Sequence, residues 1–192
     1  VGSVSGGGIR VGSKIRFTEY QAAIGLVQMQ NLEKETNTRW ENAKYLSEKV
    51  KSIAGISPAT LYPETTKAVY HLYPLLFNKD KFKGMPRSLF LESLRAEGIP
   101  CSSGYTPLHT QPFIQSAFES KLYQKVYDKK DLDYRSFLDK NQCPMNDRIC
   151  NEEAIWLTQN LLLGNKSSMD NIANAIEKIH DNADKIVKKF KK

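Results

Sequence analysis

A single long run of helical periodicity near the N-terminus constrains the fold of this chain more than any other feature. Between residue 18 and about residue 53, apolar side chains recur mostly at steps of three and four, the spacing of one face of an amphipathic helix. These positions are Ala23, Ile24, Val27, Leu32, Trp40, Ala43, Leu46 and Val50. Thr18 and Gln21 have capping-box spacing and Gly55 supplies a stop, so the sequence predicts a helix that begins at Thr18. Such a length indicates a helix that bridges two domains.

Three later segments have the composition of strands. Residues 69–77 are rich in aromatic and β-branched side chains, and Pro74 within them favours an edge strand or a bulge. Residues 99–103 and 154–157 are shorter candidates. These strands predict a small, mainly antiparallel sheet.

Two further helices are predicted around this sheet. Residues 87–97 predict a helix with Pro86 in its first turn and Gly98 at its end. The last helix begins near Ser168 and places one apolar face toward the core. That face comprises Ile172, Ala173, Ile176, Ile179, Ala183, Ile186 and Val187. The expected fold class is α+β, with helices packed on one side of the sheet.

Composition argues against several classes of protein. No apolar run approaches the roughly 20 residues of a membrane span, and residues 1–11 lack the hydrophobic core of a signal peptide, so we expect a cytoplasmic protein without a membrane partner. The cysteines are odd in number and irregularly spaced, which favours reduced structural residues: Cys101, Cys143 and Cys150. The histidines lie on separate elements, so no metal site is expected: His71, His109 and His180.

The positive charge of the chain is concentrated at its C-terminus. The formal net charge is +7 with a pI near 9.2, which is compatible with binding to nucleic acid. Much of the excess comes from the lysines of the final segment, Lys185, Lys188, Lys189, Lys191 and Lys192. Cations suit the C-terminal end of a helix dipole, so we favour a solvated helix end and expect no nucleic-acid partner.

Residues 16–25, Arg-Phe-Thr-Glu-Tyr-Gln-Ala-Ala-Ile-Gly, resemble the Arg-Met-Thr-Glu and Gln-Ala-Ala segment of the DegT/DnrJ/EryC1/StrS family of pyridoxal-phosphate sugar aminotransferases. Other segments are similar to the family in the same order along the chain. They are Arg39 with Asn42-Ala43, Ala54-Gly55-Ile56, His71-Leu72-Tyr73-Pro74, Arg87 to Gly98-Ile99-Pro100, Tyr105-Thr106-Pro107-Leu108-His109-Thr110-Gln111-Pro112, and Cys143-Pro144 leading to Leu161-Leu162-Leu163-Gly164. Each segment alone is a weak signal, and the set is specific.

The resemblance covers only the C-terminal half of that family. The family's cofactor-carrying lysine, its aspartate partner of the pyridinium nitrogen and its phosphate cup all lie upstream of this match, so we expect a fragment or a truncated product. The implied fold is the small domain of a fold-type-I aminotransferase. We predict a Gly/Ser-rich loop from the missing large domain at residues 1–17, an interdomain helix at 18–54 and a small α+β domain at 55–192.

The resemblance also implies residues that bind cofactor and substrate. Lys14 stands where the family has an asparagine that reaches the pyridoxal phosphate of the other subunit of a homodimer, and an ammonium serves a phosphate as a point charge. The alternative for Lys14 is a surface lysine before a helix. Arg16 matches a family arginine and is predicted to bind a carboxylate, a phosphate or a nucleotide-sugar group, with a structural salt bridge as its alternative.

Tyr105 and His109 match the family loop that reaches the active-site cleft, and both are predicted to bind substrate. A lone histidine is often a hydrogen-bonded structural residue, which is the alternative for His109. His71 lies in a predicted strand and is expected in the core. No catalytic residue is expected within this chain.

Three functions follow from these observations. The first is the C-terminal part of an aminotransferase that moves an amino group from glutamate or glutamine to a keto group of a nucleotide-linked sugar or cyclitol. The second is a dehydratase of the same family, in which an upstream histidine replaces the lysine. The third is a non-catalytic basic module. An exchange of amines through the cofactor needs a lysine and a held pyridinium ring, so we predict that this chain alone is inactive.

Overall fold

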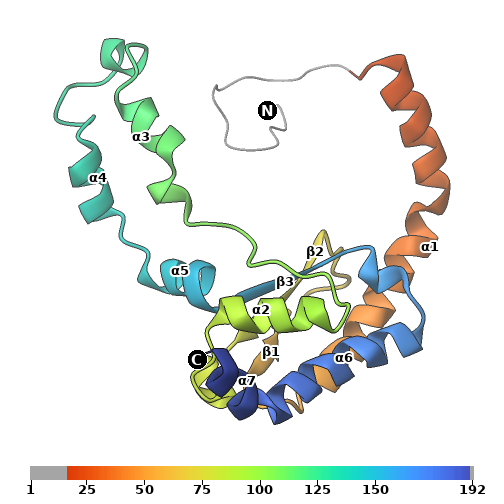
Figure 1. The fold of residues 1–192 in the computed structure, drawn as a ribbon. Helices are drawn as coiled ribbons and strands as arrows, with labels where there is room; N and C mark the ends of the chain where they lie inside the picture. The colour runs from red at the N-terminus through yellow and green to blue at the C-terminus, as the bar shows by residue number, and fades with distance from the viewer. Residues whose placement is uncertain (1–16, 191–192) are drawn as a thin grey trace. The chain divides into compact units, whose positions relative to one another are not determined.

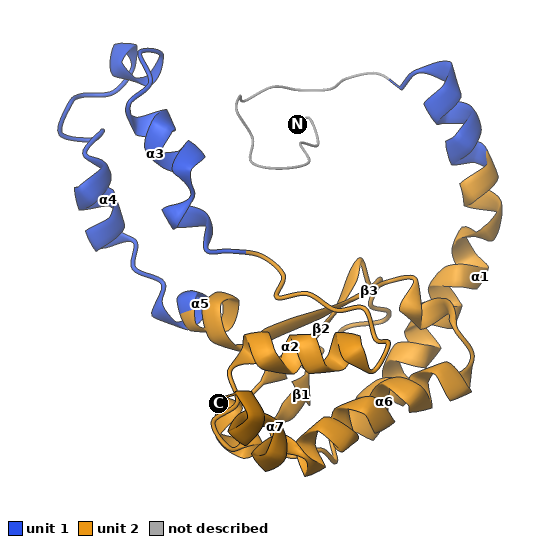
Figure 2. Ribbon diagram, viewed as in Figure 1, with its two compact units in different colours: residues 1–26, 106–147 blue, residues 27–105, 148–192 orange. Residues whose placement is uncertain are grey.

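A computed structural model of the protein describes residues 17–190, and Figure 1 shows the order of their helices and strands. The chain divides into two compact units, which Figure 2 colours separately. Unit 1 comprises residues 1–26 and 106–147, and unit 2 comprises residues 27–105 and 148–192. No helix within residues 17–190 combines the length and apolar character needed to cross a membrane. The domain boundaries expected after residues 17 and 54 stay a prediction.

Helix α1 (Glu19–Val50) begins where the sequence predicts. The Thr18 amide donates to Gln21 Oε1 at 3.0 Å and the Gln21 amide donates to Thr18 Oγ1 at 3.3 Å, which confirms the capping box. The apolar stripe, however, is buried only toward the C-terminal end of the helix, at Ala43, Leu46 and Val50.

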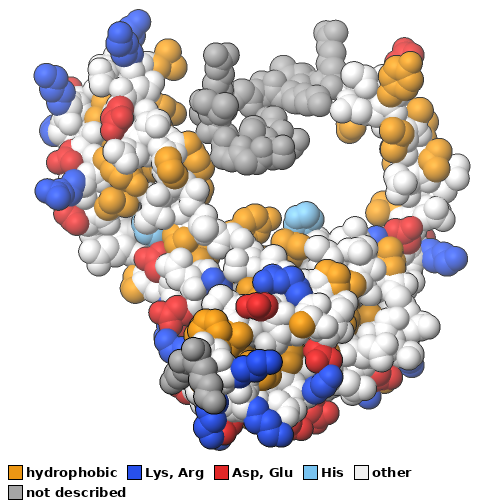
Figure 3. Space-filling model, viewed as in Figure 1, with side chains coloured by type: hydrophobic (Ala, Val, Ile, Leu, Met, Phe, Trp, Pro, Cys, Tyr) orange, Lys and Arg blue, Asp and Glu red, His pale blue; other side chains and the backbone are white. Residues whose placement is uncertain are grey.

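The first half of α1 leaves its apolar side chains in solvent. Ile24, Val27 and Leu32 are each more than half exposed, and Figure 3 shows apolar side chains on the surface of this part of the helix. The packing of this first half on another domain stays a prediction.

The sheet of unit 2 is antiparallel, with strand order β1-β2-β3. Strand β1 is Ile56–Pro58, β2 is Leu72–Phe77 and β3 is Ala154–Thr158. Ile56 pairs with Phe77, and Leu75 pairs with Ile155. The strands predicted at 69–77 and 154–157 are confirmed with shorter or shifted ends. Strand β1 was not predicted, because three residues with a proline show no periodicity.

Three expectations about these strands are wrong. The segment 99–103 forms only an isolated bridge, in which Ser102 pairs with Trp156. His71 is exposed rather than buried, because β2 begins one residue after it. Pro74 lies in the central strand, not at an edge.

The ladder explains how β2 tolerates Pro74. Its partner Trp156 makes both backbone hydrogen bonds to Ser102 on the far side of β3, so the Pro74–Trp156 pair exchanges none. The missing N–H of Pro74 therefore points toward Ala59, the residue after β1, whose amide donates to the Pro74 carbonyl at 3.4 Å. The proline therefore removes at most one hydrogen bond, the return bond to the Ala59 carbonyl, at the end of the β1–β2 ladder.

One face of the sheet is buried by helices α2 (Arg87–Ala96) and α6 (Lys166–Asp181), as Figure 1 shows. The buried strand residues alternate with exposed or half-buried ones along β2. An aromatic cluster joins sheet and helix, with the Phe77 ring centroid 4.7 Å from that of Phe90 and 4.9 Å from that of Phe82. The predicted α+β class, with helices on one side of a small antiparallel sheet, is confirmed.

The C-terminal helix is two helices rather than one. Helix α6 begins after Asn165, whose Oδ1 accepts from the Ser168 amide, and it ends before Asn182. The Asn182 side chain donates to the Lys178 carbonyl, and α7 (Ala183–Phe190) follows. The predicted apolar face continues across the break, with Ala183 and Val187 buried.

Unit 1 contains short helices that the sequence did not predict. They are α3 (Pro112–Phe118), α4 (Tyr134–Lys140) and α5 (Pro144–Arg148), whose last residue lies in unit 2. Phe118 packs on Phe137 with ring centroids 4.9 Å apart, but within residues 106–147 only Pro107 is buried. Shorter turns are η1 (Lys79–Phe82), η2 (Leu108–Thr110), η3 (Tyr123–Lys125), the π-helical turn η4 (Ile149–Glu153) and η5 (Leu161–Leu163).

Asn42 is a buried polar side chain that joins α1 to the turn before α6. Its Nδ2 donates to the carbonyl oxygen of Leu162 at 2.8 Å and to that of Gly164 at 2.7 Å. One amide group thus serves the carbonyl of the buried Leu162 and that of the half-buried Gly164. This contact explains why the helix carries asparagine at a position on its core face.

We expect Asn42→Ala to lower the free energy of unfolding of unit 2 by about 2 kcal/mol, because it leaves buried carbonyl groups unsatisfied. Both tryptophans, Trp40 and Trp156, lie in unit 2, so urea unfolding followed by tryptophan fluorescence reports on this unit. The matched control is Asn31→Ala, at an exposed position of the same helix. Equal midpoints for the two variants would contradict the structural role of Asn42.

Candidate functional site

Two of the predicted binding residues, Lys14 and Arg16, lie outside the described residues. The described chain begins at Phe17, directly before the capped start of α1. The roles of Lys14 in cofactor binding and of Arg16 in substrate binding therefore stay predictions.

The predicted substrate loop passes from one unit to the other. Tyr105 is the last residue of its segment of unit 2, and His109 lies in unit 1. The structure places the two residues in different local environments, and each is described separately.

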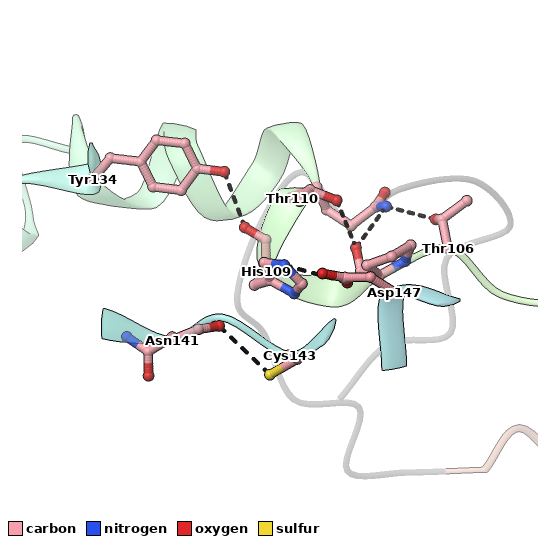
Figure 4. A network of polar contacts seen from close by, with 9 residues as sticks. Thr106, His109, Thr110, Tyr134, Asn141, Cys143 and Asp147 are labelled. Atoms are coloured by element: carbon pink, nitrogen blue, oxygen red, sulfur yellow. Dashed lines mark hydrogen bonds and ion pairs between the residues drawn. The ribbon is translucent and has the colours of Figure 1, made fainter. Parts of the chain in front are cut away.

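His109 lies in the turn η2, and an acidic side chain faces its ring. Its Nε2 is 3.5 Å from Asp147 Oδ1, and the His109 side chain is only 14% exposed. Figure 4 shows the imidazole and the carboxylate pointing toward each other from η2 and α5. The Asp147 Oδ1 atom is buried and has no hydrogen-bond partner. His109 is thus a half-buried histidine beside a carboxylate rather than an isolated surface residue.

Polar contacts hold the backbone of the turn that carries His109. Tyr134 Oη donates to the His109 carbonyl at 2.9 Å, from helix α4 (Figure 4). Thr110 Oγ1 and Gln111 Nε2 both donate to the Pro107 carbonyl at 3.1 Å. These bonds restrain the loop before any ligand binds, which lowers the entropy that binding would cost.

Tyr105 lies on the second face of the sheet in unit 2. Its ring meets the ring of Trp156 edge-on, with centroids 5.3 Å apart, and its side chain is 61% exposed. Gly104 approaches the indole so closely that a Cβ there would lie 1.8 Å from Trp156 Nε1. The phenol of Tyr105 therefore contacts one aromatic neighbour while most of the residue stays exposed to solvent.

Unit 2 also contains a surface cavity of about 780 Å³, lined in part by Lys79, Arg87 and Glu152. Arg87 Nη1 donates to the carbonyls of Cys150 at 2.8 Å and Ala154 at 3.1 Å, and burial lowers the pKa of Arg87. The hydrogen bond from Lys79 lowers the pKa of Glu152. Lys79 and Glu152 bind each other, and Arg87 binds backbone carbonyls. These charged side chains therefore have structural partners, and we assign no ligand to this cavity.

The comparisons with known proteins define the class. Residues 3–129 match the DegT/DnrJ/EryC1/StrS aminotransferase family, and the chain belongs to this family. It is 30% identical over 170 residues to the L-glutamine:2-deoxy-scyllo-inosose aminotransferase of Streptoalloteichus tenebrarius. The match covers 88% of this chain and 39% of that relative, so the chain spans about two fifths of its length.

Solved structures show the same fold. PseC of Helicobacter pylori, an aminotransferase of pseudoaminic acid biosynthesis, aligns with a TM-score of 0.62 and 24% identity over 90% of this chain and 40% of that one. A GDP-4-keto-6-deoxymannose-3-dehydratase aligns with a TM-score of 0.55 and 20% identity over 86% of this chain and 37% of that one. The structure corresponds to part of a fold-type-I aminotransferase, as the sequence predicted.

The described residues do not fit a complete pyridoxal phosphate site. A lysine that carries this cofactor must lose its proton, which requires desolvation or a neighbouring cation. Every lysine within residues 17–190 is exposed. Hydrogen bonds to Asp170 and Glu152 instead raise the pKa of Lys49 and Lys79. Within residues 17–190, no group of three or more His, Cys, Asp or Glu side chains is arranged to hold a metal ion.

Sequence reasoning missed Asp147, Tyr134 and Trp156 as partners of the predicted site residues. Asp147 follows the Cys143-Pro144 pair, and proline at the start of a helix was a usable signal that α5 begins there. Which side chain that helix turns toward His109 depends on contacts between segments 38 residues apart in sequence. No local pattern contains that information.

We expect Gly104→Ala to destabilise unit 2 by about 3 kcal/mol, because its Cβ must displace Trp156 in addition to adopting a strained positive φ. The matched control is Gly84→Ala, which has a similar φ of 74° and nothing within 4 Å of the new Cβ. That variant should lose about 1 kcal/mol. Urea unfolding with tryptophan fluorescence measures both, and equal losses would contradict the close packing of Gly104 on Trp156.

Proposed function

We propose that this chain is the C-terminal part of a pyridoxal phosphate-dependent aminotransferase. In this proposal the enzyme transfers an amino group from glutamine or glutamate to a keto group of a nucleotide-linked sugar or a cyclitol. Membership of the aminotransferase family supports the reaction. The similarity over 88% of the chain to a glutamine:inosose aminotransferase is the observation that carries the substrate class.

The described site is chemically suited to a ligand rich in hydroxyl groups. Tyr105 offers an exposed phenol hydroxyl, and His109 offers an imidazole restrained by a turn and a neighbouring carboxylate. Neither residue is a strong nucleophile or a cofactor anchor in this setting. We assign both to substrate binding rather than to bond making.

Lys14 and Arg16 complete the proposal. Both immediately precede the capped N-terminus of α1, and we assign Lys14 to the cofactor phosphate and Arg16 to an anionic group of the substrate. In this proposal the complete enzyme is a cytoplasmic homodimer, and these two residues are donated across its interface. The cofactor is held by parts of the protein outside residues 17–190.

A dehydratase of the same family is the second candidate, because a sugar 3-dehydratase shares this fold. It differs at the upstream position that carries the lysine in aminotransferases. The third candidate is a non-catalytic basic module, motivated by the net charge of +7.

We predict that the 192-residue chain alone, supplied with pyridoxal phosphate, forms no amino product, whereas the protein that also contains its large domain does. The assay uses glutamine labelled with ¹⁵N at its α-amino group and 2-deoxy-scyllo-inosose or a nucleotide-linked keto-sugar. Label in an amino-sugar or aminocyclitol supports the proposal. Loss of a substrate hydroxyl without label identifies the dehydratase, and turnover by the chain alone would contradict the predicted inactivity.

We expect Lys14→Ala, made in the protein with its large domain, to weaken retention of pyridoxal phosphate by about one order of magnitude. The reason is the loss of one charge-assisted contact worth about 1.5 kcal/mol. Absorbance titration measures the affinity, and Lys34→Ala, at an exposed position of α1, is the control. Equal affinity in both variants would count against a phosphate contact by Lys14.

A further inference from the structure

We propose that Asp147 is a positioning residue that holds the His109 imidazole with its proton on Nε2, the nitrogen that faces Asp147, and with a lone pair on Nδ1. Asp147 and His109 both lie in unit 1, so the inference uses only contacts within that unit. The part that concerns the ligand rests on the proposed function. The part that concerns the ring does not.

Hydrogen bonds fix the backbone of His109. The orientation of its ring about χ2 is not fixed by them. Tyr134 Oη binds the His109 carbonyl, and the Gln111 amide closes η2 by donating to the Leu108 carbonyl at 3.1 Å. These bonds set where the His109 side chain starts. They do not set whether Nε2 or Cε1 faces Asp147, because a half-turn of the ring about its χ2 angle exchanges these two atoms.

The backbone that carries the carboxylate facing the ring is anchored independently of His109. Asp147 lies on α5, where its amide donates to the Cys143 carbonyl at 2.9 Å. Its Oδ1 is buried without a hydrogen bond, and a desolvated carboxylate oxygen strongly favours any N–H donor within reach. Among the described residues, His109 Nε2 at 3.5 Å is the ion-pair partner of this carboxylate. A small approach of the ring turns this contact into a hydrogen bond.

The chemistry of the two groups then determines the tautomer. An ionised carboxylate only accepts hydrogen bonds, and a neutral imidazole has one N–H and one bare nitrogen. The proton of the neutral ring therefore lies on Nε2, and Nδ1 presents a lone pair. A ring oriented by a carboxylate in this way is a general device for fixing which nitrogen faces a ligand.

Nδ1 of His109 would then accept a hydrogen bond from a hydroxyl of the sugar or cyclitol. A hydroxyl can both donate and accept, so the contact survives protonation of the ring with the direction of donation reversed. Asp147 contributes to binding through His109 without touching the ligand. Its removal should therefore mimic part of the loss of His109.

The test on the chain as it exists is ¹⁵N NMR of the histidine rings. At a pH where His109 is neutral, we expect its proton on Nε2 alone, with a ring N–H signal downfield of the backbone amides. In Asp147→Asn this proton should exchange with water at least about tenfold faster, since the ring loses a carboxylate partner. Asp139→Asn, which removes an exposed carboxylate of α4, is the matched control and should leave the signal unchanged.

The wild-type spectrum alone can overturn the inference if Asp147→Asn fails to fold. A His109 ring protonated on Nδ1, or a mixture of both tautomers with rapid exchange, would show that Asp147 does not position it. His109→Gln identifies the signal. An unchanged ring proton in a folded Asp147→Asn variant would also overturn the inference.

A kinetic measurement separates this inference from the proposed function. In the protein with its large domain, His109→Ala and Asp147→Asn should each raise the KM of the sugar or cyclitol, by about tenfold for His109→Ala and by less for Asp147→Asn. The double variant should be no worse than His109→Ala, because both act through one ring. Additive losses would overturn the positioning role. Absence of transamination with the expected NMR result would sink only the proposed function.

Discussion

Docking of the second half of α1 onto the sheet and α6 is the contact on which the rest of unit 2 depends. Ala43, Leu46 and Val50 are fully buried, and Asn42 ties the helix to the carbonyls of Leu162 and Gly164. The hydrophobic contacts supply most of the free energy, and the amide fixes the register of one helix against the turn before the other. Because α1 is continuous from Glu19 to Val50, the same contact anchors a helix whose first half remains exposed.

The exposed first half of α1 is consistent in physical terms with a chain that is one part of a larger family member. An exposed apolar stripe on a capped helix is unfavourable in isolation, and in our proposal the upstream part of the enzyme covers it. The residues assigned to cofactor and anion binding, Lys14 and Arg16, precede this helix, whereas Tyr105 and His109 come from a loop restrained by Trp156 and Tyr134. In our proposal, this chain supplies substrate contacts and the upstream domain supplies the cofactor chemistry.

The features that sequence predicted are those with local physical causes. The Thr18 cap, the helix after Pro86 and strand β2 follow from hydrogen-bonding chemistry and periodicity that span a few residues. The failures have non-local causes. Pro74 occupies a central strand because the ladder leaves its missing N–H beyond the end of β1, and His71 is exposed because β2 starts after it. The pairing of His109 with Asp147 is a tertiary contact that no periodicity encodes.

The most direct test of the central claim is borohydride reduction of the protein purified from its natural source, followed by intact mass measurement and peptide mapping. Our account predicts a polypeptide well above the 21.8 kDa of this chain, with reduced cofactor attached to a lysine on a peptide upstream of Val1. Peptides from residues 17–190 should carry no cofactor. A protein of 21.8 kDa without bound cofactor, or a cofactor attached within those residues, would contradict the account.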